Sequence, residues 1–215
     1  YHKISLLHAE KIIAELMESI LREVEVPVMA HEILGDAITF YSVDTGAPDQ
    51  ADNIYHQLNR YFIAFREREA GLISECSLCK CEACKQVGKL RLKAILHYGQ
   101  AAFTQVQNIQ KISGEDVIIS HRLLKNLVPS KEYILMSKAF IDRSLYLNET
   151  SFTPHKEHYD DVGAVSLCLH NMDHPDFAPA KQSTWEKWKG FLAIEGHTIK
   201  RIFKRQDKSF ANLPV

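Results

Sequence analysis

Any fold of this chain has to accommodate a segment of closely spaced cysteines, CSLCKCEAC, at residues 76–84. The segment holds four of the five cysteines of the chain: Cys76, Cys79, Cys81 and Cys84. Thiolates two or three residues apart can surround one ion with short loops, and Zn²⁺ accepts four sulfurs in a tetrahedron. The pattern therefore predicts a structural metal site, with zinc favoured over an iron–sulfur cluster. Redox-active thiols without a metal are the alternative.

The charge balance and hydropathy of the chain exclude several classes of protein. Lysine and arginine number 26 against 27 acidic residues, which gives a net charge of −1 and no general attraction to nucleic acids or anionic membranes. No apolar run reaches the roughly 18 residues that a membrane span needs. Residues 1–24 lack the layout of a signal peptide. We therefore expect a cytoplasmic chain with neither a nucleic-acid partner nor a membrane span.

Hydrophobic periodicity predicts a mixed α+β domain. The expected elements are a helix at 4–24, a hairpin at 29–42, a helix at 51–74, strands within 89–112, a helix at 115–127, strands at 132–137 and 162–170, and a final helix at 182–204. The natural packing for this order places the helices on one face of a mainly antiparallel sheet. In the hairpin, Gly35 and Asp36 form the expected turn.

Three motifs occur in a fixed order: EILGDAITFY at 32–41, LRLKAILHYGQAAF at 90–103 and KISGEDVIISHRLLKNL at 111–127. In this order and spacing they resemble the class III nucleotidyl cyclase homology domain, and most closely an uncharacterised bacterial branch with a cysteine cluster. The resemblance implies a ferredoxin-like βαββαβ core in a cyclase-like domain over 1–170, which works as a head-to-tail homodimer. The cysteine cluster then lies in an insertion at 75–87, and 171–215 form a helical extension.

The resemblance also implies roles for individual residues. Active cyclases hold two Mg²⁺ or Mn²⁺ ions with two aspartates; Asp36 matches the second, and the first belongs to a strand expected upstream of the first helix. Glu32 and Lys111 match the pair that selects the purine base, with the charges of the adenylyl pair inverted. Arg122 matches the arginine that stabilises the transition state, although a solvated helix face is an equally good interpretation of this residue.

Two positions depart from the family's pattern. Ile118 stands where an asparagine orients the ribose, and isoleucine can neither donate nor accept a hydrogen bond. Asp160 stands near the place of a lysine that neutralises phosphate, with Lys156 as a weak substitute. Each loss is expected to lower the rate on the order of 10²-fold.

Three hypotheses follow from these residues. The first is a degenerate cyclase-like domain that binds a purine nucleotide or acts as a dimeric regulatory module. The second is an active Mg²⁺-dependent cyclase that converts a nucleoside triphosphate to a cyclic monophosphate with altered base recognition. The third is an interaction module stapled by zinc, with no nucleotide role.

Overall fold

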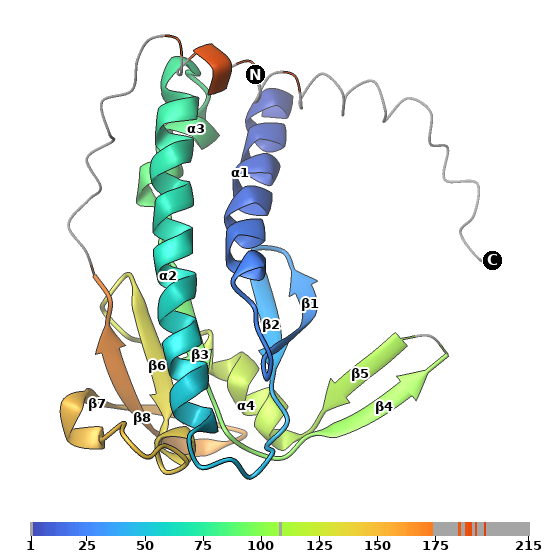
Figure 1. Ribbon diagram of the computed structural model, residues 1–215, viewed down its shortest axis with the longest axis vertical. Helices are drawn as coiled ribbons and strands as arrows, with labels where there is room; N and C mark the ends of the chain where they lie inside the picture. Colours follow the sequence, from blue (N-terminus) through green and yellow to red (C-terminus); the bar gives the residue numbers. More distant parts are fainter. Residues whose placement is uncertain are drawn as a thin grey trace.

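The computed structural model describes residues 2–107 and 109–173, together with residues 185, 188–190, 192 and 196 (Figure 1). The elements, in order, are α1 (His2–Arg22), β1 (Met29–Leu34), β2 (Ala37–Tyr41), α2 (Gln50–Glu75), η1 (Cys76–Leu78), α3 (Glu82–Gln86), η2 (Val87–Lys89), β3 (Lys93–Leu96), β4 (Ala102–Val106), β5 (Ile109–Ser113), α4 (Glu115–Leu123), β6 (Tyr133–Ser137), α5 (Lys138–Ile141), η3 (Glu149–Ser151), β7 (Thr153–Tyr159) and β8 (Gly163–Asn171). The α+β class predicted from the sequence is confirmed.

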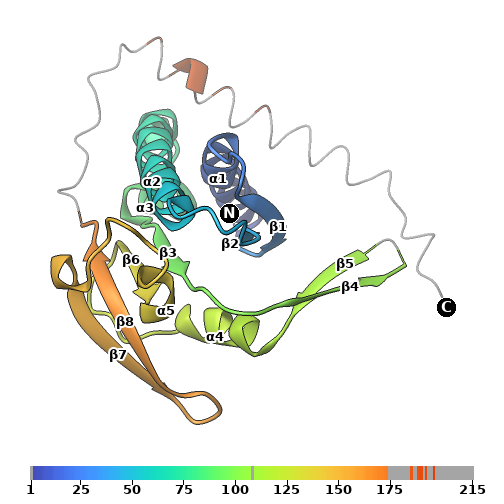
Figure 2. The same cartoon turned by 60° about the horizontal axis from the view of Figure 1, so that its bottom comes forward.

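The central sheet has four strands in the order β3-β6-β8-β7. β3 and β6 are parallel, whereas β8 is antiparallel to both β6 and β7. The hairpins β1–β2 and β4–β5 form two further sheets of two strands each. The β4–β5 hairpin extends away from the central sheet (Figure 2). The two hairpins meet where the rings of Tyr41 and Phe103 lie 5.3 Å apart.

The helices cover both faces of the central sheet, whereas the sequence analysis expected them on one. On one face, Ile134 and Met136 of β6 join the core formed with α1 and α2. On the other face, Tyr133 and Leu135 pack with Leu123 of α4. The physical reason is the sequence of β6, which is buried at every position and therefore needs an apolar cover on each side.

The long helices α1 and α2 lie side by side and supply most of the larger core (Figures 1 and 2). On α1, Ile12, Leu16 and Ile20 recur every four residues, so their side chains form one buried stripe. Phe62 and Phe65 of α2 belong to the same core, and Phe62 is fully buried. Between the two helices, Arg68 of α2 forms an ion pair with Glu15 of α1, and it also pairs with Glu75 of α2.

The HYG segment after β3 is fixed to the start of α4. His97 Nε2 lies 3.0 Å from Asp116 Oδ1, and the Gln100 amide donates to Asp116 Oδ2 at 2.7 Å. A Cβ on Gly99 would lie 2.1 Å from the Asp116 side chain, so only glycine allows this approach. The motif at 97–99 therefore has a structural role at the base of the β4–β5 hairpin.

None of the helices that the structure describes combines the length and the hydropathy that a membrane crossing needs. Most of the helix predicted at 182–204 lies outside the described residues. At positions 185, 188–190, 192 and 196 the chain is helical.

Candidate metal centre

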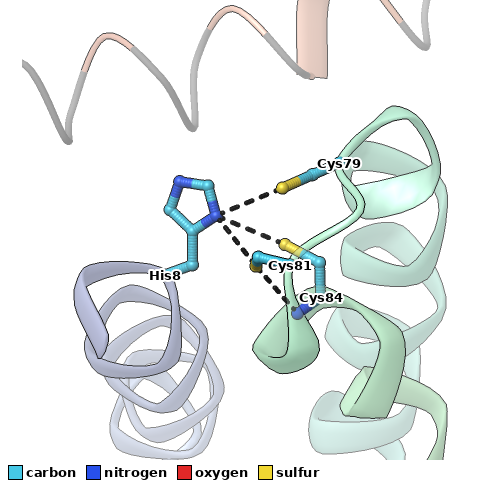
Figure 3. Close-up of side chains that lie close together, drawn as sticks. All are labelled: His8, Cys79, Cys81 and Cys84. Atoms are coloured by element: carbon cyan, nitrogen blue, oxygen red, sulfur yellow. Dashed lines mark hydrogen bonds between the residues drawn. The ribbon is translucent and has the colours of Figure 1, made fainter. Parts of the chain in front are cut away.

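Four side chains from two distant parts of the sequence converge at one end of the α1–α2 pair. They are His8 of α1 and, from the segment after α2, Cys79, Cys81 and Cys84 (Figure 3). One ligand atom from each lies within 4.8 Å of all the others. No other group of three or more His, Cys, Asp or Glu residues meets this criterion in the part of the chain that the structure describes.

Local structure places each of these donors. His8 precedes Ile12 by one helical repeat, so it continues the buried stripe of α1, and it is fully buried. Cys81 is the N-cap of α3, where its sulfur accepts a hydrogen bond from the Cys84 amide at 3.4 Å. The Ser5 hydroxyl accepts a bond from the Ala83 amide at 3.3 Å and thereby joins α1 to α3 directly.

The distances from His8 Nδ1 to the three sulfurs are nearly equal: 3.5 Å to Cys79, 3.4 Å to Cys81 and 3.5 Å to Cys84. A single ring nitrogen has either one proton or one lone pair, so it cannot hydrogen-bond to three thiols at once. A tetrahedral ion with bonds of about 2.3 Å to sulfur and about 2.0 Å to nitrogen separates N from S by about 3.5 Å. The spacing therefore fits four ligands around one ion, such as zinc.

The thiols lie in surroundings that disfavour negative charge when no cation is present. Burial raises the pKa of Cys79 to about 12, although the Cys81 amide works in the opposite direction. The pKa of Cys84 is also raised, first by interaction with the Cys76 thiol and then by burial. At neutral pH such groups stay protonated as thiols, and a divalent cation reverses this because it is the largest local positive charge.

Cys76, which the sequence analysis placed among the metal ligands, lies outside the group of four. It follows α2 directly, is 3% exposed, and sits close enough to Cys84 to raise its pKa. All five cysteines are free thiols in the structure. The fourth donor of the converged group is His8, which the sequence analysis did not identify. The sequence does contain one indication of this ligand, because His8 lies in register with the apolar stripe of α1 and is therefore expected to point into the core.

The structure places Asp36 and Glu32 on the β1–β2 hairpin. Asp36 lies in the turn and Glu32 lies in β1 opposite Thr39, and both are exposed. Asp36 belongs to no cluster of potential metal ligands among the described residues. The hairpin thus presents both carboxylates to solvent.

Lys111 and Arg122 lie on other elements. Lys111 is exposed in β5, opposite Thr104, and the described structure contains no ion pair between it and Glu32. Arg122, in the last turn of α4, pairs with Asp161 in the β7–β8 turn at 2.8 Å, and its side chain is 51% exposed. Within the part of the chain that the structure describes, therefore, no hydrogen bond or ion pair joins any two of the four residues suggested by the family resemblance.

A cleft of about 280 Å³ lies at the end of the parallel strands β3 and β6. His97, Ile119, Ser137 and Lys138 line it, together with residues of the β7–β8 hairpin. None of the residues expected to bind a nucleotide is among its lining residues.

Comparison with known proteins gives a family and a few relatives. The family model described as "Protein of unknown function (DUF2652)" matches residues 13–133. The uncharacterized protein Rv2561/Rv2562 of Mycobacterium tuberculosis is 28% identical over 205 residues, which cover 93% of this chain and 94% of the relative. Two structures of bacterial light-regulated adenylyl cyclases align with TM-scores of 0.45 and 0.43, at 12% and 11% identity. Each alignment covers 90% of this chain, which spans about half (50%) of either cyclase.

Proposed function

We propose that this chain, which belongs to the DUF2652 family, is a cyclase-like regulatory domain whose helical pair is stapled by one structural Zn²⁺. The observation that carries the proposal is the position of His8 Nδ1 at 3.4–3.5 Å from three cysteine sulfurs. One imidazole and three thiolates are a common donor set of structural zinc sites. With four protein ligands the ion has no open position for a substrate, so its role is to hold α1 against the segment that follows α2.

The regulatory role rests on the residues that cyclisation would need. Arg122 is engaged by Asp161, and Ile118 is 52% exposed on α4, where the resemblance implies a ribose-orienting asparagine. Without that asparagine and the phosphate-neutralising lysine, two electrostatic contributions to the transition state are missing. We therefore propose that 1–170 form a degenerate cyclase-like unit, with the metal-binding insertion at 75–87 and an extension at 171–215.

The nucleotide role is the second part of the proposal. Asp36, Glu32 and Lys111 are all exposed, and they lie on two separate hairpins. In a homodimer, a hairpin from each copy can face the other, which would let Asp36 hold Mg²⁺ or Mn²⁺ beside a purine nucleotide. Glu32 and Lys111 would then contact the base, and Arg122 would contact phosphate after exchange of its Asp161 partner.

An active cyclase with altered base recognition is the competing function. Two observations support this competing function. Asp36 is exposed and the Arg122 side chain is half exposed, so both groups are open to an incoming nucleotide. A zinc-stapled interaction module without a nucleotide role is the third possibility.

Two measurements on the full-length protein distinguish these functions. Metal analysis should give about one zinc per chain in a colourless sample, whereas a brown sample would indicate an iron–sulfur cluster. Calorimetry with ATP or GTP and Mn²⁺ should show binding, with only trace cyclic product on prolonged incubation. Rapid formation of cyclic product would establish the active cyclase, and absence of binding would leave the interaction module.

The matched variants for the nucleotide role are Asp36→Ala and Glu67→Ala, since both remove an exposed carboxylate. Asp36→Ala should abolish metal-dependent binding, while Glu67→Ala, on α2, should leave it unchanged. Equal binding by the two variants would refute the role of Asp36.

A further inference from the structure

We infer that the metal centre holds zinc in two alternative ligand sets, in which Cys76 replaces His8 and thereby releases α1 from the ion. The inference rests on the proposed zinc site and adds a regulation to it. In the first set the donors are His8, Cys79, Cys81 and Cys84, as in Figure 3. In the second set all four donors are cysteines of the 76–84 segment.

The centre offers one donor more than a tetrahedral ion accepts. Cys76 is buried next to Cys84, although it lies outside the group of four. The Cys79 amide donates to the Cys76 carbonyl at 3.0 Å, which closes a tight turn between these two residues. Cys76 with Cys79, and Cys81 with Cys84, are thus two chelating pairs at the two-residue spacing found in zinc sites. The segment contains a complete ligand set without α1.

The two candidate fourth ligands differ in how they are held. Cys76 is local, because it lies only three residues from Cys79 along the chain. His8 comes from a position 71 residues before Cys79, so only the packing of α1 keeps it at the ion. A donor on a short connection has a high effective concentration at the site. Any shift of α1 that withdraws His8 therefore leaves the ion open to a thiol that already interacts with one of its ligands, Cys84.

The exchange is balanced without a redox partner. The bond from zinc to His8 Nδ1 breaks, and a bond from zinc to Cys76 Sγ forms. The Cys76 thiol gives up its proton, which the freed imidazole or water accepts. The all-thiolate set carries one more negative charge than the first set, and the nearby cation Lys85, which follows Cys84 in the chain, pairs with Glu82 at 2.7 Å.

The consequence concerns the β1–β2 hairpin. α1 ends at Arg22, and residues 23–28 lead directly into β1. This connection is anchored on α2, because Gln57 donates to the Glu25 carbonyl at 2.9 Å and Arg60 pairs with the Glu25 carboxylate at 2.6 Å. The hairpin that carries Asp36 is thus joined to α1 along the chain through residues 23–28, and a shift of α1 on release from the ion would act on the hairpin through this connection.

The test uses full-length protein loaded with Zn²⁺ or Co²⁺, with the variants His8→Asn, Cys76→Ser and their combination. Each single variant should keep about one metal per chain, while the double variant should lose at least 100-fold in affinity. The Co²⁺ form of His8→Asn should show the stronger sulfur charge-transfer absorption of a four-thiolate site, and that of Cys76→Ser a three-thiolate spectrum. Cys168→Ser, at a buried cysteine of β8, is the control and should match the wild type.

Loss of metal from His8→Asn alone, with Cys76→Ser unaffected, would overturn the inference while leaving the zinc site intact. A wild type that binds no zinc would instead refute the proposed function itself. Should His8→Asn fail to fold, transfer of zinc to a chelator provides the second measurement. Cys76→Ser should release zinc at least tenfold faster than wild type because it lacks the replacement ligand, and equal rates would overturn the inference.

Discussion

Asp52, in the first turn of α2, offers a stringent test of how the loop after α5 is held. Its side chain accepts hydrogen bonds from the Ser144 hydroxyl, from the Leu145 amide at 2.8 Å and from the Tyr146 amide at 3.2 Å. The residue is only 3% exposed. Hydrogen bonds to charged groups contribute about 1.5–3 kcal/mol each, but the bonds of one carboxylate are not additive. For Asp52→Asn, which keeps one acceptor oxygen, we expect a loss of about 2–3 kcal/mol.

The stability that Asp52 contributes should also depend on pH. Burial alone would raise the pKa of Asp52, but the bonds from Ser144, Leu145 and Tyr146 outweigh it and hold that pKa below its usual value of 3.8. Because the pKa is depressed in the folded state, the stabilisation is complete above the unfolded-state pKa. It is lost as the pH falls through the folded-state pKa.

Urea unfolding of wild type and Asp52→Asn at pH 7 and near pH 3 measures both effects. At pH 7 the urea midpoint of the variant should be lower than that of the wild type. Near pH 3 the difference between the two midpoints should be smaller. Asp49→Asn is the control, since Asp49 is exposed and forms no side-chain cap of the same helix. Equal midpoints at pH 7, or a gap that does not change with pH, would refute the role assigned to the Asp52 carboxylate.

Three further outcomes are expected. Removal of metal by a chelator should lower the thermal midpoint of the wild type and leave the His8→Asn, Cys76→Ser double variant, which lacks both candidate fourth ligands, nearly unchanged; equal shifts would contradict a structural ion. Gly99→Ala should cost about 1–3 kcal/mol in urea unfolding, because its methyl group would collide with Asp116, and an unchanged midpoint would contradict that contact. Arg122→Ala should change stability by less than about 1 kcal/mol, because the pair with Asp161 is half exposed. A simultaneous loss of nucleotide affinity would support a phosphate contact by Arg122.

The helices and most strands of the fold were predictable because their signals are local. The spacing of Ile12, Leu16 and Ile20 predicts α1, and the run YILMS predicts a buried strand that the structure shows as β6. The strand β7 was not predicted, because residues 153–159 alternate charged and polar side chains without a repeated apolar face. It is a strand because β8 supplies its hydrogen-bonding partner, which is information from elsewhere in the chain.

The metal site shows the same division between local and distant information. Cys79, Cys81 and Cys84 could be selected from spacing alone, since they lie within six residues of one another. His8 could not, because only the packing of α1 against α2 brings it to the sulfurs. Spacing alone also favoured Cys76 as the fourth ligand. Which fourth donor binds is decided by competition between a local thiol and a distant imidazole, and a sequence pattern contains no measure of that competition.

The position of the centre defines what it can influence. His8 and Arg22 are 14 residues apart on α1, which corresponds to about 21 Å along a helix with a rise of about 1.5 Å per residue. The ion is therefore about 21 Å from the end of α1 that leads toward β1, and Asp36 is not among the residues that converge on it. Any change in nucleotide affinity caused by His8→Asn must consequently pass through α1 and its connection to β1. The same substitution thus separates a regulatory role of the zinc from a purely structural one, because a structural staple would alter stability and leave nucleotide affinity unchanged in the folded protein.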